Sequence, residues 1–565
     1  MIKTTPVYTI ENECQDCYKC VRHCHCKAIR IIDGKASVIT ENCVACGECV
    51  KVCPSHAKMI RSELARLRQM LGREQKLYAS IAPSFTAFFP GATIGQLAAA
   101  LKKIGFAGVA ETAVGAQCVS SQTAKFLQET DLPLVISSAC PACVDYIRKY
   151  HPEYTANIVP MHSPIMAHCR MIKDRFGEDS KVIFFGPCAA KKNEADRHPE
   201  LLALAMTFNV LEELLDEHDI VPISEEPAEL LMEAAEEGRF YAIEGGMNDT
   251  LRDGNNTVRY LSVSGLENLD RMLKLYRGTA GKRKIFLEAL ACPGGCINGP
   301  VIPASAAGSM DVIAETDRIS TMEPSSKRDA RENIADTFRA APLEKALATE
   351  RELTIALARV GKFTREDELN CGGCGYNTCR EFAEALIRNN AEEAMCHTYL
   401  RKNFERTSNA LIRFIPAAVV MVDEELNICE CNRNFALMTG MTEIYDALGN
   451  LNTIAIDTVL PDFAELFSSV ISNGGEIEKF NQKLQDKIVN ISVFSIAHGK
   501  SAGAVIQDIT RNELQREQIA EKAREVIRKN VQTVQQVARL FGEHVADTEI
   551  LLHEIAGSYE RRGGD

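Results

Sequence analysis

The sequence predicts a multidomain protein of mixed α/β and α+β class, and three observations support this prediction. The chain has 565 residues, more than a single hydrophobic core usually supports. Between about residues 78 and 340, apolar strand-like runs alternate with helical stretches, as in an α/β domain with a parallel sheet. The 22 cysteines gather in short clusters, which in a long chain that starts without a signal-peptide core favours metal ligands over disulfides.

Residues 1–60 contain two cysteine runs of the same spacing, Cys14-x2-Cys17-x2-Cys20-x3-Cys24 and Cys43-x2-Cys46-x2-Cys49-x3-Cys53. This is the spacing of bacterial ferredoxins with two 4Fe-4S clusters, in which the fourth cysteine of each run binds the other run's cluster. A pair of zinc sites is the alternative, and three closely spaced thiolates per run disfavour it. The expected ligand sets are Cys14, Cys17, Cys20 and Cys53 for one cluster, and Cys43, Cys46, Cys49 and Cys24 for the other.

Residues 61–77 have the charge and leucine spacing of a linker helix, and residues 78–340 are expected to form one α/β domain. Its first strand begins at Tyr78 and ends in the turn Ala82-Pro83-Ser84. A cysteine motif follows each of three later strands, at the sheet edge where α/β proteins usually carry their sites. These strands are predicted at Leu134 to Ile136, Val182 to Phe185 and Lys284 to Leu290, and helices at Thr93 to Lys103 and Pro227 to Glu237.

The three motifs are Ser137-Ser-Ala-Cys140-Pro-Ala-Cys143, Phe184-Phe-Gly-Pro-Cys188-Ala-Ala-Lys191-Lys-Asn-Glu194 and Glu288-Ala-Leu-Ala-Cys292-Pro-Gly-Gly-Cys296. Cysteines beside proline and glycine let the backbone approach a buried cluster closely, so the motifs make sense if they converge. Together they resemble the active-site motifs of the iron-only (FeFe) hydrogenases. The resemblance covers about residues 1 to 400 and rests on the cysteine motifs.

The resemblance implies an H-cluster, which is a 4Fe-4S cubane joined to a diiron unit that carries CO and cyanide. The cubane ligands are then Cys140, Cys188, Cys292 and Cys296, with Cys296 as the bridging thiolate. Lys191 matches a lysine that donates a hydrogen bond to one cyanide, and Glu194 matches the glutamate that pairs with it. Ser84 is the expected donor to the other cyanide. A solvated surface lysine is the alternative for Lys191.

The departures from the family affect proton transfer. In productive members a cysteine that delivers protons precedes the first cluster ligand, and here that position is Ala139, whose methyl group carries no proton. The rest of the family's proton route maps approximately to Gln122, Phe126 and Val159. General acid–base transfer typically contributes about 10²- to 10⁴-fold to a rate, so we expect a site that binds hydrogen and turns over slowly. This pattern resembles the sensory branch of the family.

Residues 341–404 are expected to form a helical linker and a small single-cluster 4Fe-4S domain. Glycines in Cys371-Gly-Gly-Cys374-Gly-Tyr-Asn-Thr-Cys379 free the backbone to surround a cluster, and a helix from Arg380 to Ala394 then leads to Cys396. The fourth thiolate would thus return to the same site. A zinc site is the alternative for these four cysteines.

Residues 405–510 lack cluster spacing and resemble a PAS domain. Strands are expected at Ala417 to Val422 and Asn427 to Cys431, a helix start at Asn432-Arg-Asn434-Phe435, and a final hairpin closing with Asp508-Ile-Thr510. The PAS ligand is not identified by the sequence. Residues 511–565 form one helical pattern with a coiled-coil seam from Ile527 to Val545, for which packing back on the PAS domain is the alternative.

The other six cysteines have no predicted cluster. Cys429 and Cys431 are two apart on a predicted strand and are expected to share one face in the core. Cys143 is a candidate proton relay, with a small buried hydrophobe as the alternative. No role is assigned to Cys26, Cys118 or Cys169.

The net charge of −13 argues against nucleic acid or an anionic membrane as a partner. No apolar run approaches the roughly 20 residues of a membrane span, so we expect a cytoplasmic protein. The sequence therefore predicts an anaerobic hydrogen sensor that slowly and reversibly oxidises H2 and passes its redox state through three accessory 4Fe-4S clusters to the PAS domain. The expected partners are a ferredoxin-like protein, hydrogenase maturation proteins, a separate phosphatase or kinase, and a second copy in a homodimer.

Two alternatives stay open. A working hydrogenase coupled to ferredoxin or NADH would need a proton route. An iron–sulfur assembly scaffold would lack the diiron unit, and the retention of Lys191 and Glu194 argues against it.

Overall fold

The computed structural model describes residues 5–73, 76–233, 237–251, 257–276, 278, 283–303, 333–343, 348–510 and 522–534. The chain divides into two compact units, unit 1 (Met1–His397) and unit 2 (Thr398–Asp565). Among the helices described, none is both long enough and apolar enough to cross a membrane.

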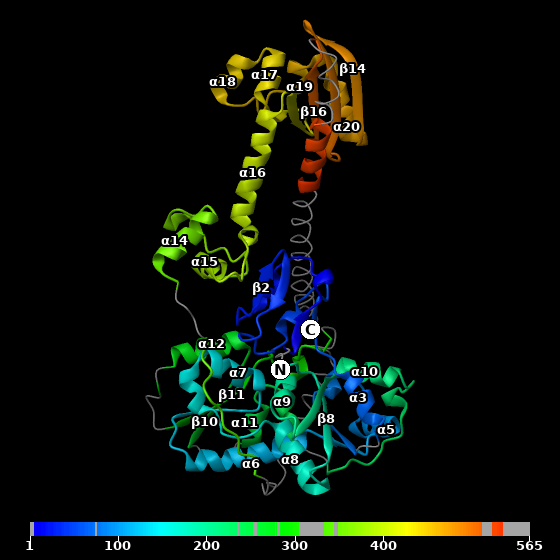
Figure 1. Ribbon diagram of the computed structural model, residues 1–565, viewed down its shortest axis with the longest axis vertical. Coiled ribbons are helices and arrows are strands. Elements are labelled where there is room, and N and C mark those ends of the chain that lie inside the picture. Colours follow the sequence, from blue (N-terminus) through cyan, green and yellow to red (C-terminus); the bar gives the residue numbers. More distant parts are fainter. Residues whose placement is uncertain are drawn as a thin grey trace, which may run out of the picture. The chain divides into compact units, whose positions relative to one another are not determined.

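The N-terminal cysteine segment, residues 5–60, consists of short elements because cysteine loops occupy most of it (Figure 1). Strand β1 (Val7–Thr9) pairs antiparallel with β4 (Lys58–Ile60), and β2 (Ile29–Ile32) forms a hairpin with β3 (Lys35–Val38). Helices α1 (Lys19–His23) and α2 (Glu48–Lys51) lie inside the two cysteine runs. Each run therefore folds around a turn of helix, which orients its thiols toward one side.

The two-sheet body, residues 77–303, contains two separate parallel sheets. One has the order β6-β5-β8-β9 and the other β10-β11-β7. Parallel strands place all their carboxyl ends at one edge, where α/β proteins usually carry their sites. The strands are β5 (Leu77–Ile81), β6 (Gly108–Glu111), β7 (Leu134–Ile136), β8 (Lys181–Gly186), β9 (Leu202–Thr207), β10 (Val258–Ser264) and β11 (Lys284–Leu290).

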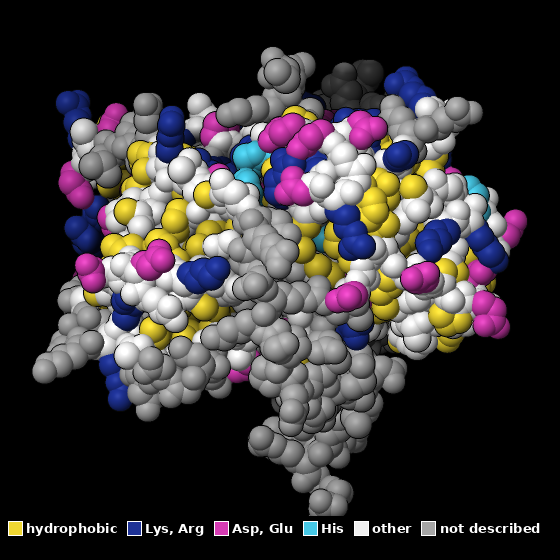
Figure 2. Space-filling view, turned by 90° about the horizontal axis from the view of Figure 1, so that it is seen from below, with side chains coloured by type: hydrophobic (Ala, Val, Ile, Leu, Met, Phe, Trp, Pro, Cys, Tyr) yellow, Lys and Arg dark blue, Asp and Glu magenta, His cyan; other side chains and the backbone are white. Residues whose placement is uncertain are grey.

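Helices cover both sheets and bury their apolar residues. Helix α5 begins with a capping box, in which the Thr93 side chain and Gln96 each satisfy a backbone N–H of the other. On the face of the molecule in Figure 2, hydrophobic side chains are interspersed with acidic and basic ones. The helices are α3 (Leu64–Leu71), α4 (Phe85–Phe88), α5 (Ile94–Ile104), α6 (Ala113–Glu129), α7 (Pro141–Tyr150), α8 (Pro164–Phe176), α9 (Lys191–Arg197), α10 (Phe208–Asp216), α11 (Gly246–Leu251) and α12 (Leu266–Leu275).

The helix expected from Pro227 to Glu237 is wrong over its described residues, 227–233 and 237. Residues 227–233 run without regular secondary structure. There, Ala228 N–H donates to the Gly95 carbonyl at 2.9 Å, and Leu231 N–H donates to the Val109 carbonyl at 2.8 Å. These backbone bonds to other elements replace the bonds of a helix, so tertiary contacts override the local propensity.

The linker helix expected at residues 61–77 is shorter than predicted. Helix α3 covers Leu64–Leu71, and strand β5 already begins at Leu77. Glu63, the residue before α3, pairs with the buried ammonium group of Lys192 and is thereby fixed against α9.

The small cysteine module, residues 348–397, has two helices, α14 (Glu350–Arg359) and α15 (Cys379–Ile387). Helix α15 ends seven residues before the predicted Ala394, and a single 3-10 turn (Glu393–Met395) leads to Cys396. Leu353, Leu357 and Ala383 form the small apolar core between the helices.

Unit 2 contains a five-stranded antiparallel sheet of order β13-β12-β16-β15-β14, and four helices connect β13 to β14. Phe435, Phe467 and Ile491 are fully buried in its core. The strands are β12 (Ala418–Asp423), β13 (Ile428–Cys431), β14 (Glu476–Leu484), β15 (Lys487–Ala497) and β16 (Ser501–Asp508); the helices are α16 (His397–Phe414), α17 (Arg433–Thr439), α18 (Thr442–Leu448), α19 (Ile456–Val459) and α20 (Ala464–Asn473).

The expectation that Cys429 and Cys431 share a face is wrong. Cys431 is buried, whereas Cys429 is exposed. The pairing register of β12 and β13 shifts at this point, because Met421 pairs with Glu430 and Val422 with Ile428. Cys429 is thus the extra residue of a β-bulge, which breaks the alternation of faces.

The predicted coiled-coil seam falls mostly outside the described residues. Residues 522–534 are helical, and Val531 and Val534 are exposed there. The remainder of the seam, from residue 535 to Val545, is not described.

Candidate iron–sulfur site

The three predicted cysteine motifs of the two-sheet body all lie at the carboxyl ends of parallel strands. Cys140 follows β7 and Cys292 follows β11 in one sheet, while Cys188 follows β8 in the other. Cys140 is also the N-terminal cap residue of α7, with Pro141 in the first helical turn. The site therefore lies where the two sheets meet, and both sheets contribute thiols to it.

The four predicted cubane ligands are close enough for their charges to interact. Burial and the nearby Cys188 and Cys140 thiolates together raise the pKa of Cys296 to about 12, against the opposing effect of the Lys191 ammonium. Burial and the Cys140 thiolate raise the pKa of Cys188 to about 11. Burial also raises the pKa of Cys292, together with Cys188, Cys296 and Cys140. As thiolates, four cysteines buried this close together would repel one another, and a positive centre such as iron would neutralise their charge.

Cys140 differs from the other three thiols. A hydrogen bond from the Cys143 thiol lowers the pKa of Cys140 to about 6, and backbone N–H groups and the Lys191 ammonium act in the same direction. Cys143 is fully buried. The Cys143 side chain is therefore positioned as a donor to a cluster ligand.

The loop between Cys292 and Cys296 needs its glycines. Gly295 has a φ angle of 108°, and a Cβ atom there would lie 2.5 Å from the Ala242 carbonyl oxygen. Neither the backbone conformation nor the space accepts a side chain. The loop can consequently hold two cysteines against the neighbouring backbone.

Lys191 is not a solvated surface lysine. Its side chain is 11% exposed, and its Nζ atom pairs with Glu194 Oε2 at 2.7 Å. The same ammonium donates to Ser163 Oγ at 2.9 Å and to the Ala139 carbonyl at 3.5 Å. The lysine is thus fixed beside the cysteines, as its predicted role requires, although that role itself remains a prediction.

Ser84 lies at the end of β5, which pairs in parallel with β8, the strand that leads to Cys188. It is fully buried, and its hydroxyl has no hydrogen-bond partner among the described residues. A buried hydroxyl without a partner costs free energy, so a missing acceptor at this place fits the predicted cyanide contact.

The positions onto which the family's proton route maps lie in largely apolar surroundings. Val159 is buried in an apolar cluster, and Phe126 and Ala139 pack against the same cluster. Gln122 lies on α6 within this region and makes a contact of its own. None of these four side chains ionises as an acid.

Glu288 is a residue that the sequence reasoning missed. It lies in β11 and is 1% exposed, and burial raises the pKa of its carboxyl group to about 7. The Met247 N–H donates to its Oε1 atom at 3.2 Å, while Oε2 has no partner in the described structure. An acidic residue in the middle of the otherwise apolar stretch Ile285 to Leu290 was the available signal.

The eight cysteines of the N-terminal segment separate into two groups. The Cys20 thiol interacts with Cys17, Cys14 and Cys53, and burial raises its pKa to about 11. Burial raises the pKa of Cys49 well above its ordinary value, with Cys46, Cys24 and Cys43 as neighbours. These groups correspond to the two predicted ligand sets, in which Cys24 and Cys53 cross over.

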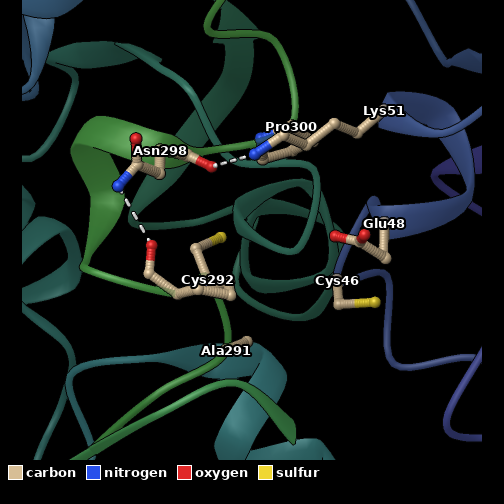
Figure 3. Close-up of a pocket in the computed structure, with 8 residues that line it drawn as sticks. Cys46, Glu48, Lys51, Ala291, Cys292, Asn298 and Pro300 are labelled. Carbon is tan, nitrogen blue, oxygen red and sulfur yellow. Dashed lines mark hydrogen bonds between the residues drawn. The ribbon is translucent and has the colours of Figure 1, made fainter. Parts of the chain in front are cut away.

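The second of these groups adjoins the two-sheet body. Cys46 and Cys292 line one small pocket, in which Lys51 Nζ donates to the Asn298 carbonyl at 3.4 Å (Figure 3). Gly47 allows this approach, because its Cβ atom would lie 2.5 Å from Pro300. On the other side of the segment, Tyr150 of α7 donates to the carbonyls of Cys26 and Asn42, each at 2.9 Å.

The cysteines of the small cysteine module also approach one another. Burial and the neighbouring Cys396 and Cys371 thiolates together raise the pKa of Cys374 to about 11. Cys379 is buried at the start of α15. No group of three or more His, Cys, Asp or Glu side chains in the described structure is arranged to hold a single metal ion.

Comparison with known families agrees with this geometry. Residues 75–300 match the family "Iron only hydrogenase large subunit, C-terminal domain". Residues 36–59 match a 4Fe-4S binding domain, and residues 367–397 match an Fe-S cluster family. The chain therefore contains an iron-only hydrogenase-type domain of mixed α/β fold, together with iron–sulfur cluster-binding segments on both sides of it.

Curated relatives fall into more than one functional class. The nuclear prelamin A recognition factor of Xenopus laevis is 25% identical over 346 residues, covering 47% of this chain and 75% of the relative. The periplasmic [Fe] hydrogenase large subunit of Nitratidesulfovibrio vulgaris is 27% identical over 268 residues, 37% of this chain and 63% of the relative. The cytosolic iron-sulfur assembly component 3 of Mus musculus is 25% identical over 344 residues, 47% of this chain and 71% of the relative.

Proposed function

We propose that this chain is a sensory iron-only hydrogenase that binds H2 at an H-cluster and oxidises it slowly and reversibly. The observation that carries this proposal is the fixed Lys191–Glu194 pair beside the four cysteines, combined with Ala139 at the usual proton-donor position. The anchor for a diiron unit is kept, whereas the fast proton route is absent.

Each residue has a separate task in this proposal. The H-cluster, when bound, supplies the chemistry that converts H2 to protons and electrons. Cys140, Cys188, Cys292 and Cys296 hold it, with the glycines of the last loop permitting close approach. Lys191 donates a charge-assisted hydrogen bond to one anionic ligand, and Ser84 donates to another. Glu194 pairs with the lysine and orients its ammonium group.

Slow turnover follows from what surrounds the site. Ala139, Phe126 and Val159 cannot exchange protons, and they replace groups that would do so in a fast enzyme. Loss of such a relay costs about 10²- to 10⁴-fold in rate. Slow turnover suits a protein whose output is a redox state rather than a high rate of H2 conversion.

Unit 2 supports the signalling half of the proposal. Its strand order and the four helices between β13 and β14 are compatible with a PAS domain. Asn432 fixes the start of α17, because its side-chain oxygen accepts from the Phe435 and Val419 N–H groups at 2.9 and 3.0 Å. We infer that this unit passes the redox state to a separate phosphatase or kinase, and that the chain acts as a homodimer.

The second candidate function is an iron–sulfur assembly scaffold without a diiron unit. Two of the curated relatives, the mouse assembly component and a Drosophila ananassae cytosolic Fe-S cluster assembly factor, favour it by name. A scaffold has no evident use for a buried ammonium group at Lys191 that is held between Glu194 and Ser163. We therefore place it second.

Infrared spectroscopy separates the two functions. The full chain would be reconstituted anaerobically with iron and sulfide, offered the synthetic diiron unit, and recorded under nitrogen and then under hydrogen. CO and cyanide bands that shift with hydrogen would support the sensor. Four intact cubanes without any such bands would support the scaffold. Bands that persist with fast, sustained hydrogen evolution would instead indicate a working hydrogenase.

A further inference from the structure

Lys27 lies between two predicted cluster sites of unit 1. It lies three residues after Cys24 in the N-terminal cysteine segment and has a positive φ angle of 46°. Its Nζ atom donates to the Gly375 carbonyl in the small cysteine module at 2.7 Å and approaches the Val21 carbonyl at 3.4 Å. A single ammonium group thus joins segments that are 348 residues apart in the sequence.

Tyr376 completes this contact. The Lys27 ammonium lies 5.7 Å from the centre of the Tyr376 ring, within the range of a cation–π interaction. The ring is 4% exposed and lies 5.8 Å from the Phe382 ring of α15. The ring is therefore buried, and its packing on Phe382 supports its position.

The backbone on both sides is shaped for close approach. Gly375 has a φ angle of 90°, and a Cβ atom there would lie 2.9 Å from Val21 Cγ1. Nearby, the Ile31 N–H of β2 donates to the Asn390 carbonyl at 3.1 Å. The small cysteine module is thereby fastened to the N-terminal segment at two points.

Predicted cluster ligands flank the lysine on both sides, Cys24 in the N-terminal cysteine segment and Cys374 in the small cysteine module. Burial lowers the pKa of Lys27, while the charges of Cys24, Glu381 and Cys374 oppose this and favour the ammonium form. Cys24 and Cys374 likewise both interact with Tyr376. Cys24 belongs to the group with Cys43, Cys46 and Cys49, and Cys374 to the group with Cys371 and Cys396.

We propose that Lys27 and Tyr376 form the electron-transfer junction between the cluster of the Cys24 group and the cluster of the small cysteine module, and that the Lys27 ammonium stabilises the reduced state of both. In this step one electron leaves the reduced cluster of the Cys24 group and enters the oxidised cluster of the module. No proton moves. The proposal needs both clusters but not the diiron unit, so it stands apart from the proposed function.

The Cys24 group also adjoins the two-sheet body, so it has a predicted cluster site on each side. Cys46 shares a pocket with Cys292, so the Cys24 group lies between the four cysteines of the two-sheet body and the module. The other ferredoxin-type group meets the module differently, since there the like charges of Asp16 and Glu392 interact. In the proposed function, electrons that leave the H-cluster would pass the Cys24 group and Lys27 on their way to the module, but the junction itself does not depend on that source.

The test is a redox titration of the full-length reconstituted chain, followed by electron paramagnetic resonance and driven by a chemical reductant rather than by hydrogen. For Lys27→Met we expect about a tenfold lower ratio of reduced to oxidised module cluster at a fixed potential, which is about 59 mV for a one-electron couple. Lys27→Arg keeps the positive charge, so the reduction potential of the module cluster should change by only a small fraction of this shift. Iron content of each variant is measured alongside.

The control is Lys35→Met. Lys35 Nζ donates to the Cys14 carbonyl at 2.9 Å, so this lysine serves the other ferredoxin-type group. Replacing Lys35 should leave the reduction potential of the module cluster unchanged. The proposal is overturned if Lys27→Met retains its iron and the reduction potential of the module cluster does not shift. It is also overturned if Lys35→Met shifts that potential by the same amount.

A second variant tests the contact without changing charge. Gly375→Val forces the module away from Val21 and should abolish the magnetic interaction between the two reduced clusters while each still binds iron. An interaction that survives this change would show that the clusters are coupled by another route. Because hydrogen is not used, neither result depends on an H-cluster.

Discussion

Lys191 shows how a single residue separates two functions that share the same cysteines. The ammonium has three partners in the described structure, Glu194, Ser163 and the Ala139 carbonyl. A hydrogen bond to an ionised group is worth about 1.5–3 kcal/mol, and a buried charge left without a partner costs more. In the proposed function, this residue would therefore help to decide whether a charged ligand is retained.

For Lys191→Met we expect the four cubanes to form while the diiron unit is lost or bound at least tenfold less tightly. The reason is that Met has a similar shape but donates no hydrogen bond. Infrared band intensity per cubane measures the outcome. Lys125→Met, at an exposed position on α6, is the control. Full CO and cyanide bands in the Lys191 variant would contradict the assigned role.

Glu288 gives the protein a dependence of stability on pH. Its carboxyl pKa is about 7 in the folded protein, above the ordinary value of 4.5. Between these two values the unfolded chain loses a proton that the folded protein keeps, so folding stability falls as pH rises through this window and is level above it. Burial is the main cause of the shift.

Glu288→Gln should remove that part of the pH dependence. A shift of this size corresponds to roughly 2–3 kcal/mol between pH 4.5 and 7.5, as an order of magnitude. Chemical denaturation at several pH values, compared between the variant and the unchanged protein, measures the difference. Parallel pH curves for the two proteins would show that the carboxyl group ionises normally.

At the scale of elements, the glycine loop before Cys296 can be tested against a matched control. Gly295→Ala places a Cβ atom 2.5 Å from the Ala242 oxygen, whereas Gly245, with a φ of 87°, has nothing within 4 Å. Both substitutions carry the backbone cost of about 1 kcal/mol or slightly more at positive φ. Only Gly295→Ala should also lower the iron content of the two-sheet body, as measured per chain. Equal iron loss in both variants would remove the steric argument.

Elements defined by local spacing were predictable from the sequence. The strands before Cys140, Cys188 and Cys292 were expected from short apolar runs, and β7 and β11 have the predicted bounds. Helix α5, at Ile94–Ile104, lies within one residue of its predicted bounds at both ends. In each case the signal lies within a few residues of the element.

Elements that depend on distant contacts were not predictable. Residues 227–233 carry a helical composition, yet their N–H groups bond to Gly95 and Val109. The bulge at Cys429 is set by its pairing with β12, and the Lys27–Gly375 contact joins two modules. The orphaned Ser84 hydroxyl and the buried Glu288 carboxyl likewise became visible only with the fold, because burial is a property of the whole domain.

At the scale of the whole molecule, the division into two units makes a prediction about separability. Residues 1–397 contain all the predicted cluster ligands, and residues 398–565 contain a separate apolar core. We expect the chain of residues 1–397 to bind the same amount of iron and to give the same infrared bands as the full chain. Iron analysis and thermal unfolding of the shortened chain measure this. Loss of iron on shortening would show that unit 2 is needed for cluster binding.

The convergence of Cys140, Cys188 and Cys292 from two sheets has a consequence for how the protein matures. A cluster held by these thiols would tie together chain segments that are up to 152 residues apart, as a crosslink does. Closing such loops through a metal centre lowers the entropy of the unfolded chain, so the filled protein should resist unfolding far better than the empty one. The ligands also meet only after both sheets have docked. Cluster insertion would then be a late step of maturation, and it would make the folded protein resistant to unfolding.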